Sequence, residues 1–183
     1  MKYEQQITLK NGKTAILRSA VEADGKAVLD KFITTHEETD YLLSYADENS
    51  IGVKEEGEVL KRKSESENEI QILAIVDGVI VGNAGIASVG TKYKLRHRAE
   101  FGISILKEFW GLGIGKALTS ACINCAKEAG YEQLELEVVA ENTGAIALYK
   151  KAGFVEYGRN PKGFKSRISG YQELISMRLE LDN

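Results

Sequence analysis

The stretch Trp110-Gly111-Leu112-Gly113-Ile114-Gly115-Lys116 decides the fold. It joins a predicted strand at Arg98–Leu106, where apolar and polar residues alternate, to a predicted helix at Gly113–Ala129, where apolar residues recur at helical spacing. A helix N-terminus presents unpaired N–H groups and partial positive charge, and glycines in front of it let a ligand approach the main chain. The unit of strand, glycine turn and helix therefore predicts an α/β fold with a phosphate-binding turn.

Two common nucleotide motifs do not fit this turn. A Walker A loop needs glycine at position 110 and Ser or Thr after the lysine, but Trp110 and Ala117 stand there. The dinucleotide fingerprint needs its third glycine at position 116, which is Lys116. A tight turn without any ligand remains the alternative interpretation.

Strand and helix signals alternate on both sides of the turn. Ser19 and Glu22 predict a capping box that starts a helix. Asp77-Gly78 between two β-rich runs predicts a hairpin, because a type I′ turn needs positive φ at both central residues. The other predicted elements are strands at Thr14–Leu17, Ile70–Val76, Val79–Ser88, Leu134–Val138, Phe154–Tyr157 and Glu173–Leu181, and helices at Val53–Lys63 and from Asn142 to Gly153. This order predicts a single α/β domain over residues 1–183 with a mixed sheet layered by helices.

Composition excludes several functional classes. The 183 residues carry 24 Lys and Arg against 27 Asp and Glu, a net charge of −3 that gives no reason to expect binding to nucleic acid or an anionic membrane. The longest apolar run, Ile72–Val76, is far too short to span a bilayer, and the N-terminus has no apolar stretch of the secretory kind. Cys122 and Cys125 fall on the apolar face of the predicted helix, which favours two buried thiols over a redox or metal site. We therefore expect no metal and a cytoplasmic protein.

A second motif follows the glycine turn about 27 residues later: Asn142-x-x-Ala145-Ile146-x-Leu148-Tyr149-x-Lys151-x-Gly153-Phe154. Together with Trp110-Gly111-x-Gly113-x-Gly115 it resembles the GNAT N-acetyltransferase superfamily. Ala99-Glu100-Phe101-Gly102-Ile103 and Tyr171-x-Glu173-x-x-x-Met177 look closest to the ribosomal-protein and small-amine acetyltransferase branches. The resemblance implies a mostly antiparallel sheet with helices on both faces, and acetyl-CoA as cosubstrate. The sequence departs from the family's usual loop at Trp110, where Gln or Arg is common.

The resemblance also implies which residues meet the cosubstrate. The pyrophosphate would lie on the main chain of Gly111, Leu112, Gly113, Ile114, Gly115 and Lys116. Ile103, Ser104 and Ile105 would run beside the pantetheine arm and the thioester. Asn142 would reach the cofactor, and Tyr149 would stand near the sulfur.

Acetyl transfer to an amine sets two further requirements. The nucleophile must be neutral, and deprotonating an alkyl ammonium of pKa about 10.4 at pH 7 costs about 4.6 kcal/mol. Glu100 is the candidate base, and a surface glutamate paired with Arg98 or a neighbouring strand is the alternative. Tyr149 is the candidate donor to the departing thiolate, and an amphipathic core residue is the alternative.

The acceptor side is less specific. By the resemblance it would be built from the first helices and the last strands, which implicates Glu37, Glu38, Asp40, Tyr41, Tyr45, Phe164 and Tyr171. The acidic members could bind a cationic small molecule or a peptide N-terminus, or form a solvated helix end. The sequence thus predicts an N-acetyltransferase. A non-catalytic acyl-CoA sensor and a nucleotide-binding protein are the alternatives, and the oligomeric state stays open, a homodimer included.

Overall fold

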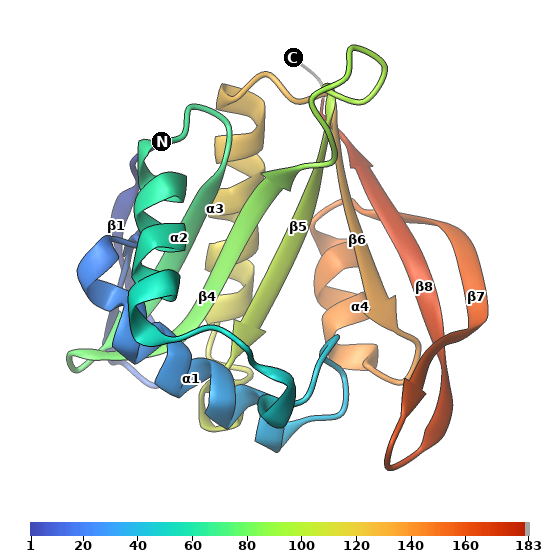
Figure 1. The fold of residues 1–183 in the computed structure, drawn as a ribbon, viewed down its shortest axis with the longest axis horizontal. Coiled ribbons are helices and arrows are strands. Elements are labelled where there is room, and N and C mark those ends of the chain that lie inside the picture. The colour runs from blue at the N-terminus through green and yellow to red at the C-terminus, as the bar shows by residue number, and fades with distance from the viewer. Residues whose placement is uncertain (182–183) are drawn as a thin grey trace.

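The computed structural model describes residues 1–181 and contains one eight-stranded sheet covered by helices on both faces (Figure 1). The strands are β1 (Glu4–Thr8), β2 (Thr14–Ser19), β3 (Ile70–Val76), β4 (Val79–Ser88), β5 (Arg98–Ile105), β6 (Gln133–Val139), β7 (Val155–Ser166) and β8 (Gly170–Glu180). The helices are α1 (Gly25–Glu38), α2 (Val53–Glu65), α3 (Ile114–Glu128) and α4 (Thr143–Lys151), with short 3-10 turns at Glu22–Asp24, Ala46–Glu48 and Lys107–Phe109. The predicted single mixed α/β fold is confirmed; residues 182–183 of the predicted domain lie outside the described part.

The sheet has the order β1-β2-β3-β4-β5-β6-β8-β7, and all neighbours are antiparallel except β5 and β6. Alternate residues of a strand face opposite sides, so each face of the sheet has its own core. The larger core lies under α3 and α4 and includes Ile72, Phe101 and Leu118. The smaller core lies under α1 and α2 and includes Leu60 and Leu73.

Local signals placed most elements correctly. The Asp77-Gly78 turn joins β3 to β4, with φ of 50° and 80°, as a type I′ turn requires. Cys122 and Cys125 are buried free thiols on the core side of α3, as expected. Burial raises the pKa of Cys125 to about 11, so the thiolate is disfavoured. No helix of residues 1–181 has the length and apolar character needed to cross a bilayer.

The predicted helix start at Ser19 is wrong. Ser19 ends β2, and its hydroxyl accepts a hydrogen bond from the Tyr3 amide at 2.7 Å, so it caps no helix. A short 3-10 turn at Glu22–Asp24 comes first, in which the Asp24 carboxylate accepts from the Val21 amide at 2.8 Å, and α1 begins only at Gly25. The hydroxyl is used by β1, a strand that the sequence analysis missed.

The last hairpin is also longer than predicted. β7 extends to Ser166 because register shifts accommodate Tyr157, which lies between Glu156 and Gly158, and residues 161–163, which include Pro161 and Gly163. A proline and bulges are tolerated there because β7 is an edge strand.

Candidate active site

Strands β5 and β6 separate in the middle of the sheet. They pair in parallel only from Arg98 opposite Gln133 to Glu100 opposite Glu135, although both continue for several residues beyond. Figure 1 shows them diverging toward the turn that precedes α3. The separation leaves one edge of β5 without a strand partner in the interior of the sheet.

The direction of the hydrogen bonds shows which residues of β5 have free main-chain groups. Arg98 accepts from the Val89 amide at 3.1 Å, and Leu106 donates to the Val81 carbonyl at 2.9 Å, so the even-numbered residues bond toward β4. Because bonding direction alternates along a strand, the odd-numbered residues face β6; Phe101 still takes part in the last parallel pairing, and residues 103 and 105 lie beyond it, opposite the separated part of β6.

The three residues predicted to run beside the pantetheine arm therefore do not all turn their main chain toward the open edge of β5. Ile103 presents its main chain to the open edge. The carbonyl of Ile105 accepts a hydrogen bond from the Trp110 indole at 2.7 Å, which gives the unusual tryptophan of the turn a structural role. The main chain of Ser104 faces β4 instead, and its side chain contacts Lys31 and Asn83.

The glycine turn delivers main-chain amides to the lower end of the same opening. Gly111 and Gly113 have φ of 75° and 103°, in the left-handed region that favours glycine. The first helical bond of α3 runs from the Ala117 amide to the Gly113 carbonyl at 3.1 Å, so the three preceding amides are free at the helix N-terminus. A Cβ on Gly115 would lie 3.2 Å from Leu148, so the third glycine lets α3 approach α4. The turn and the first turn of α3 contain all six residues predicted to hold pyrophosphate: Gly111, Leu112, Gly113, Ile114, Gly115 and Lys116.

Tyr149 lies on the α4 side of the opening. Its side chain is 7% exposed, and its ring contacts Phe101 edge-on at 6.1 Å and Phe154 at 5.9 Å between centroids. Burial raises the pKa of the Tyr149 phenol to about 12, so it is protonated at neutral pH. Asn142 positions this helix, because its side-chain oxygen accepts from the Ala145 amide at 3.2 Å.

Glu100 lies on the opposite face of β5 from Tyr149. Its side chain is exposed, and it is not the partner of Arg98, which binds Glu135 through two hydrogen bonds, one of them 2.7 Å long. The alternative of a glutamate paired with Arg98 is therefore wrong. Where the free edge of β5 begins, the Glu100 carboxylate thus lies on one face of the strand and the Tyr149 ring packs against the other.

A buried lysine that no sequence motif indicated lies beside this edge. Lys31 of α1 is 5% exposed and donates hydrogen bonds to Asn83 on β4 and Ser104 on β5, both neutral. Burial lowers the pKa of Lys31 to about 7. The available signal was its position, three residues after the buried Val28 on the apolar face of α1.

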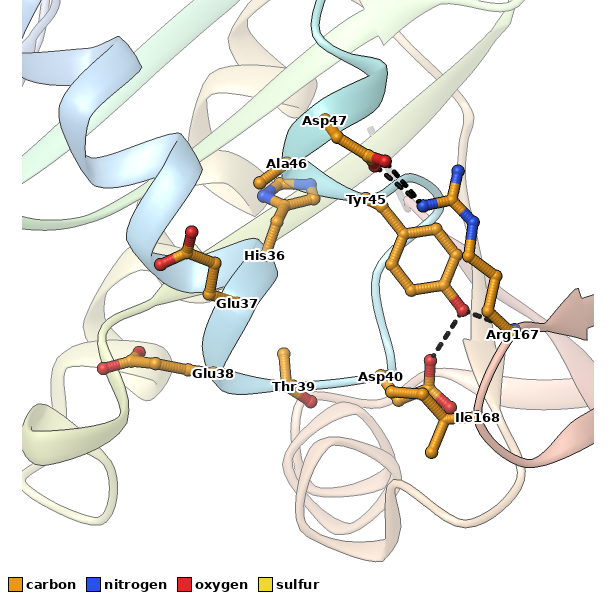
Figure 2. A pocket seen from close by; sticks show the side chains of 10 residues that line it. All are labelled: His36, Glu37, Glu38, Thr39, Asp40, Tyr45, Ala46, Asp47, Arg167 and Ile168. Atoms are coloured by element: carbon orange, nitrogen blue, oxygen red, sulfur yellow. Dashed lines mark hydrogen bonds and ion pairs between the residues drawn. The ribbon is translucent and has the colours of Figure 1, made fainter.

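The predicted acceptor residues gather in part around a cavity of about 470 Å³ at the end of α1 (Figure 2). Tyr45 donates to Asp40 at 3.1 Å, and Arg167 pairs with Asp47 at 2.8 Å. Partial burial alone would raise the pKa of Asp40, but hydrogen bonds from Ser166, Ser169 and Tyr45 outweigh it and lower the pKa. Of the seven predicted residues, Glu37, Glu38, Asp40 and Tyr45 line this cavity, and Tyr41, Phe164 and Tyr171 do not.

Most charged groups of this cavity already have partners within the protein. Besides the pairs in Figure 2, a carboxylate oxygen of Glu38 accepts from the Lys107 amide at 2.8 Å. The network ties the segment after α1 to the β7–β8 hairpin. Asp40 is thus a structural link, and the expectation that it is a free anion for a cationic amine is not supported by its hydrogen bonds.

Comparison with known proteins gives a consistent result. The model of the Acetyltransferase (GNAT) family matches residues 29–154. L-amino acid N-acetyltransferase AaaT of Escherichia coli K12 is 33% identical over 93 residues, which are 50% of this chain and 57% of that protein. A GNAT-family acetyltransferase from Streptococcus pneumoniae superposes with a TM-score of 0.87 at 26% identity, covering 91% of this chain and 99% of that one. A Salmonella typhimurium structure described as an acetyltransferase with its cofactor acetyl-CoA gives a TM-score of 0.80 at 19% identity, over 92% and 95%.

These matches agree on the α/β fold and on the protein family. Since the family match covers more than half of the chain, the chain belongs to the Acetyltransferase (GNAT) family. The resemblance inferred from the two glycine-containing motifs is confirmed. The aligned segments take up 24%, 17% and 57% of three curated relatives, so the chain spans well under their full length.

Lys31→Met should remove a pH dependence of stability. The folded pKa of Lys31 is about 7 and its ordinary value is 10.5, so the unfolded chain binds more protons between these values. The free energy of unfolding should therefore increase with pH in this window, by up to about 1.36 kcal/mol per pH unit. Urea unfolding of wild type and variant from pH 7 to 9.5 measures the difference. Lys26→Met, an exposed lysine of the same helix, is the control, and parallel curves for wild type and Lys31→Met would contradict the assignment.

Proposed function

We propose that this chain is an acetyl-CoA-dependent N-acetyltransferase that transfers the acetyl group to a primary amine by direct attack in a ternary complex. The amine would belong to a small molecule or to a peptide N-terminus. One observation carries the proposal: the free edge of β5 lies between Glu100 on one face and Tyr149 on the other, and it runs down to the glycine turn.

The residues present fit acetyl-CoA, which would supply an activated acetyl thioester. The amides of residues 114–116 and the turn glycines suit a pyrophosphate, because they combine free donors with the positive end of a helix dipole. The free N–H and C=O groups of Ile103 suit the amides of a pantetheine arm, as an added strand would. Asn142, whose oxygen caps α4, keeps its amide nitrogen for the cofactor.

Glu100 is proposed as the proton acceptor for the incoming ammonium. It lies on the α1 and α2 face, and the part of the chain that the structure describes places no cation within 4 Å of it. A carboxylate next to the acceptor would take the proton directly or through one water, which lowers the cost of forming the neutral amine. A free main-chain N–H on β5 would stabilise negative charge on the carbonyl oxygen.

Tyr149 is proposed as the donor to the departing sulfur. Its phenol lies on the other face of β5, so the nucleophile and the leaving group would occupy opposite sides of the reacting carbon. The raised pKa keeps the hydroxyl protonated throughout the neutral range, as a donor must be.

A non-catalytic acyl-CoA sensor would share the binding site and lack turnover. Release of free CoA thiol on adding amines separates the two functions. We expect release with at least one class among amino acids, polyamines, aminoglycosides and N-terminal peptides. Binding of acetyl-CoA by calorimetry with no thiol release from any class would favour the sensor.

Tyr149→Phe should lower turnover by about 10- to 100-fold, because the sulfur loses its proton donor while the ring packing is retained. The affinity for acetyl-CoA should change little. Steady-state thiol release and calorimetry measure the two quantities, and unchanged turnover would remove Tyr149 from the mechanism.

Glu100→Gln should remove the acid limb of the profile of kcat/KM against pH, because glutamine cannot accept the proton. Glu135→Gln would break the ion pair with Arg98 and is therefore not a suitable control. The matched control is Glu132→Gln, which changes an exposed glutamate just before β6. A profile that keeps its acid limb in Glu100→Gln would assign the proton to another acceptor.

A further inference from the structure

A second hollow, of about 290 Å³, lies on the face of the sheet covered by α2. Its floor crosses β4 and β5 at Gly85 and Gly102, which are register partners. A Cβ on Gly102 would meet nothing within 4 Å, so no side chain fills the space above it. We call this space the strand hollow. Phe101 and Gly102 line it at the point where β5 separates from β6, so the hollow adjoins the proposed reaction centre.

The strand hollow contains one group of each charge. Glu100 lines it from β5, and Lys63 lines it from the last turn of α2. Lys63 donates to the side-chain oxygen of Gln71 at 3.0 Å, and among residues 1–181 neither Lys63 nor Glu100 has an oppositely charged group within 4 Å. Burial lowers the pKa of Lys63, against the attraction of Glu69 and Glu56. A partly buried cation without an ion pair can gain much from an anionic ligand.

A third polar group, Asn83, is held in a fixed orientation. Lys31 and Ser104 both donate to its side-chain oxygen, the latter at 3.1 Å. Asn83 also lines the hollow, so the amide nitrogen is the end left to face a ligand there. Lys31 thus acts as a positioning residue, because its hydrogen bond to the oxygen of Asn83 turns the donor end of that amide toward the hollow.

We propose that the strand hollow binds a free amino acid as the acetyl acceptor, with Lys63 and Asn83 at its carboxylate and Glu100 at its amine. The inference rests on the proposed acetyl transfer and names the acceptor class. The volume suits a molecule of amino-acid size and is small for a peptide. The larger cavity at the end of α1 offers a poorer site, because Asp40 and Asp47 are engaged by Tyr45 and Arg167.

The test compares each of a set of L-amino acids with its own amide, which keeps the amine and removes the negative charge. Thiol release gives kcat and KM for both, and we expect kcat/KM to be at least about tenfold higher for the acid. Lys63→Met should lower kcat/KM for the acid about tenfold or more, mainly through KM, and leave the amide nearly unchanged. Lys63→Arg should restore the preference. Arg62→Met, which removes an exposed charge one residue away, should change neither.

Three outcomes would overturn the proposal: equal use of acids and amides by the wild type, better use of N-terminal peptides than of free amino acids, or an equal loss for acid and amide in Lys63→Met. Failure of the proposed function looks different, because no amine would then release thiol. In that case calorimetry with the amino acid and its amide decides. If the amino acid binds, its amide does not, and Lys63→Met abolishes binding of the amino acid, the strand hollow is supported as an amino-acid site. If neither the amino acid nor the amide binds, the proposal is overturned.

Discussion

The separation of β5 from β6 after Glu100 is the constraint on which the site depends. A strand in the interior of a sheet normally has both edges paired, because unpaired main-chain groups are costly when they are buried. Here the odd-numbered groups beyond residue 101 have no strand partner, and the main chain of Ile103 is available to an extended ligand. The Trp110 indole satisfies the last carbonyl of this edge and holds the glycine turn against the end of β5. In the proposed function, the same opening would hold the pantetheine arm, and Trp110 would mark the end of the free edge.

Side chains alternate between the two faces of β5, so neighbouring residues of this strand have different surroundings. Phe101 turns toward α4, where it packs against Tyr149 and Phe154 in the larger core. Glu100 and Gly102 turn toward α1 and α2, where the core is small and the sheet face is partly uncovered. The face with more apolar packing therefore lowers the acidity of a phenol, and the thinly covered face keeps a carboxylate accessible. The proposed proton donor, Tyr149 on α4, and the proposed proton acceptor, Glu100 on β5, therefore have different surroundings on the two faces of one strand.

Local sequence signals predicted the parts of the molecule whose structure is determined locally. The Asp77-Gly78 hairpin, the turn before α3 and the Asn142 cap depend on a few neighbouring residues, and all three are present. Ser19 failed because its hydroxyl is taken by Tyr3, a residue 16 positions away that no local pattern connects to it. The same reason explains the missed part of the site. Lys31 meets residues 52 and 73 positions distant, so the sequence could show a lysine on an apolar helix face but not what it contacts.

That missed lysine bears on how the acceptor face is organised. A buried ammonium bonded only to neutral groups is destabilising in the free protein, since its desolvation is not offset by an anion. Replacing it by an apolar residue would remove this cost and would also free the side chain of Asn83 to rotate. Retaining the lysine is reasonable where the orientation of Asn83 or the positive charge is used during the reaction. The carboxylate of an amino acid placed between Asn83 and Lys63 would lie close to both lysines, and their protonated forms would be favoured at the moment when Glu100 faces the ammonium group. Lys63 and Glu100 would then each face an opposite charge only when the strand hollow is occupied by a molecule that carries both charges.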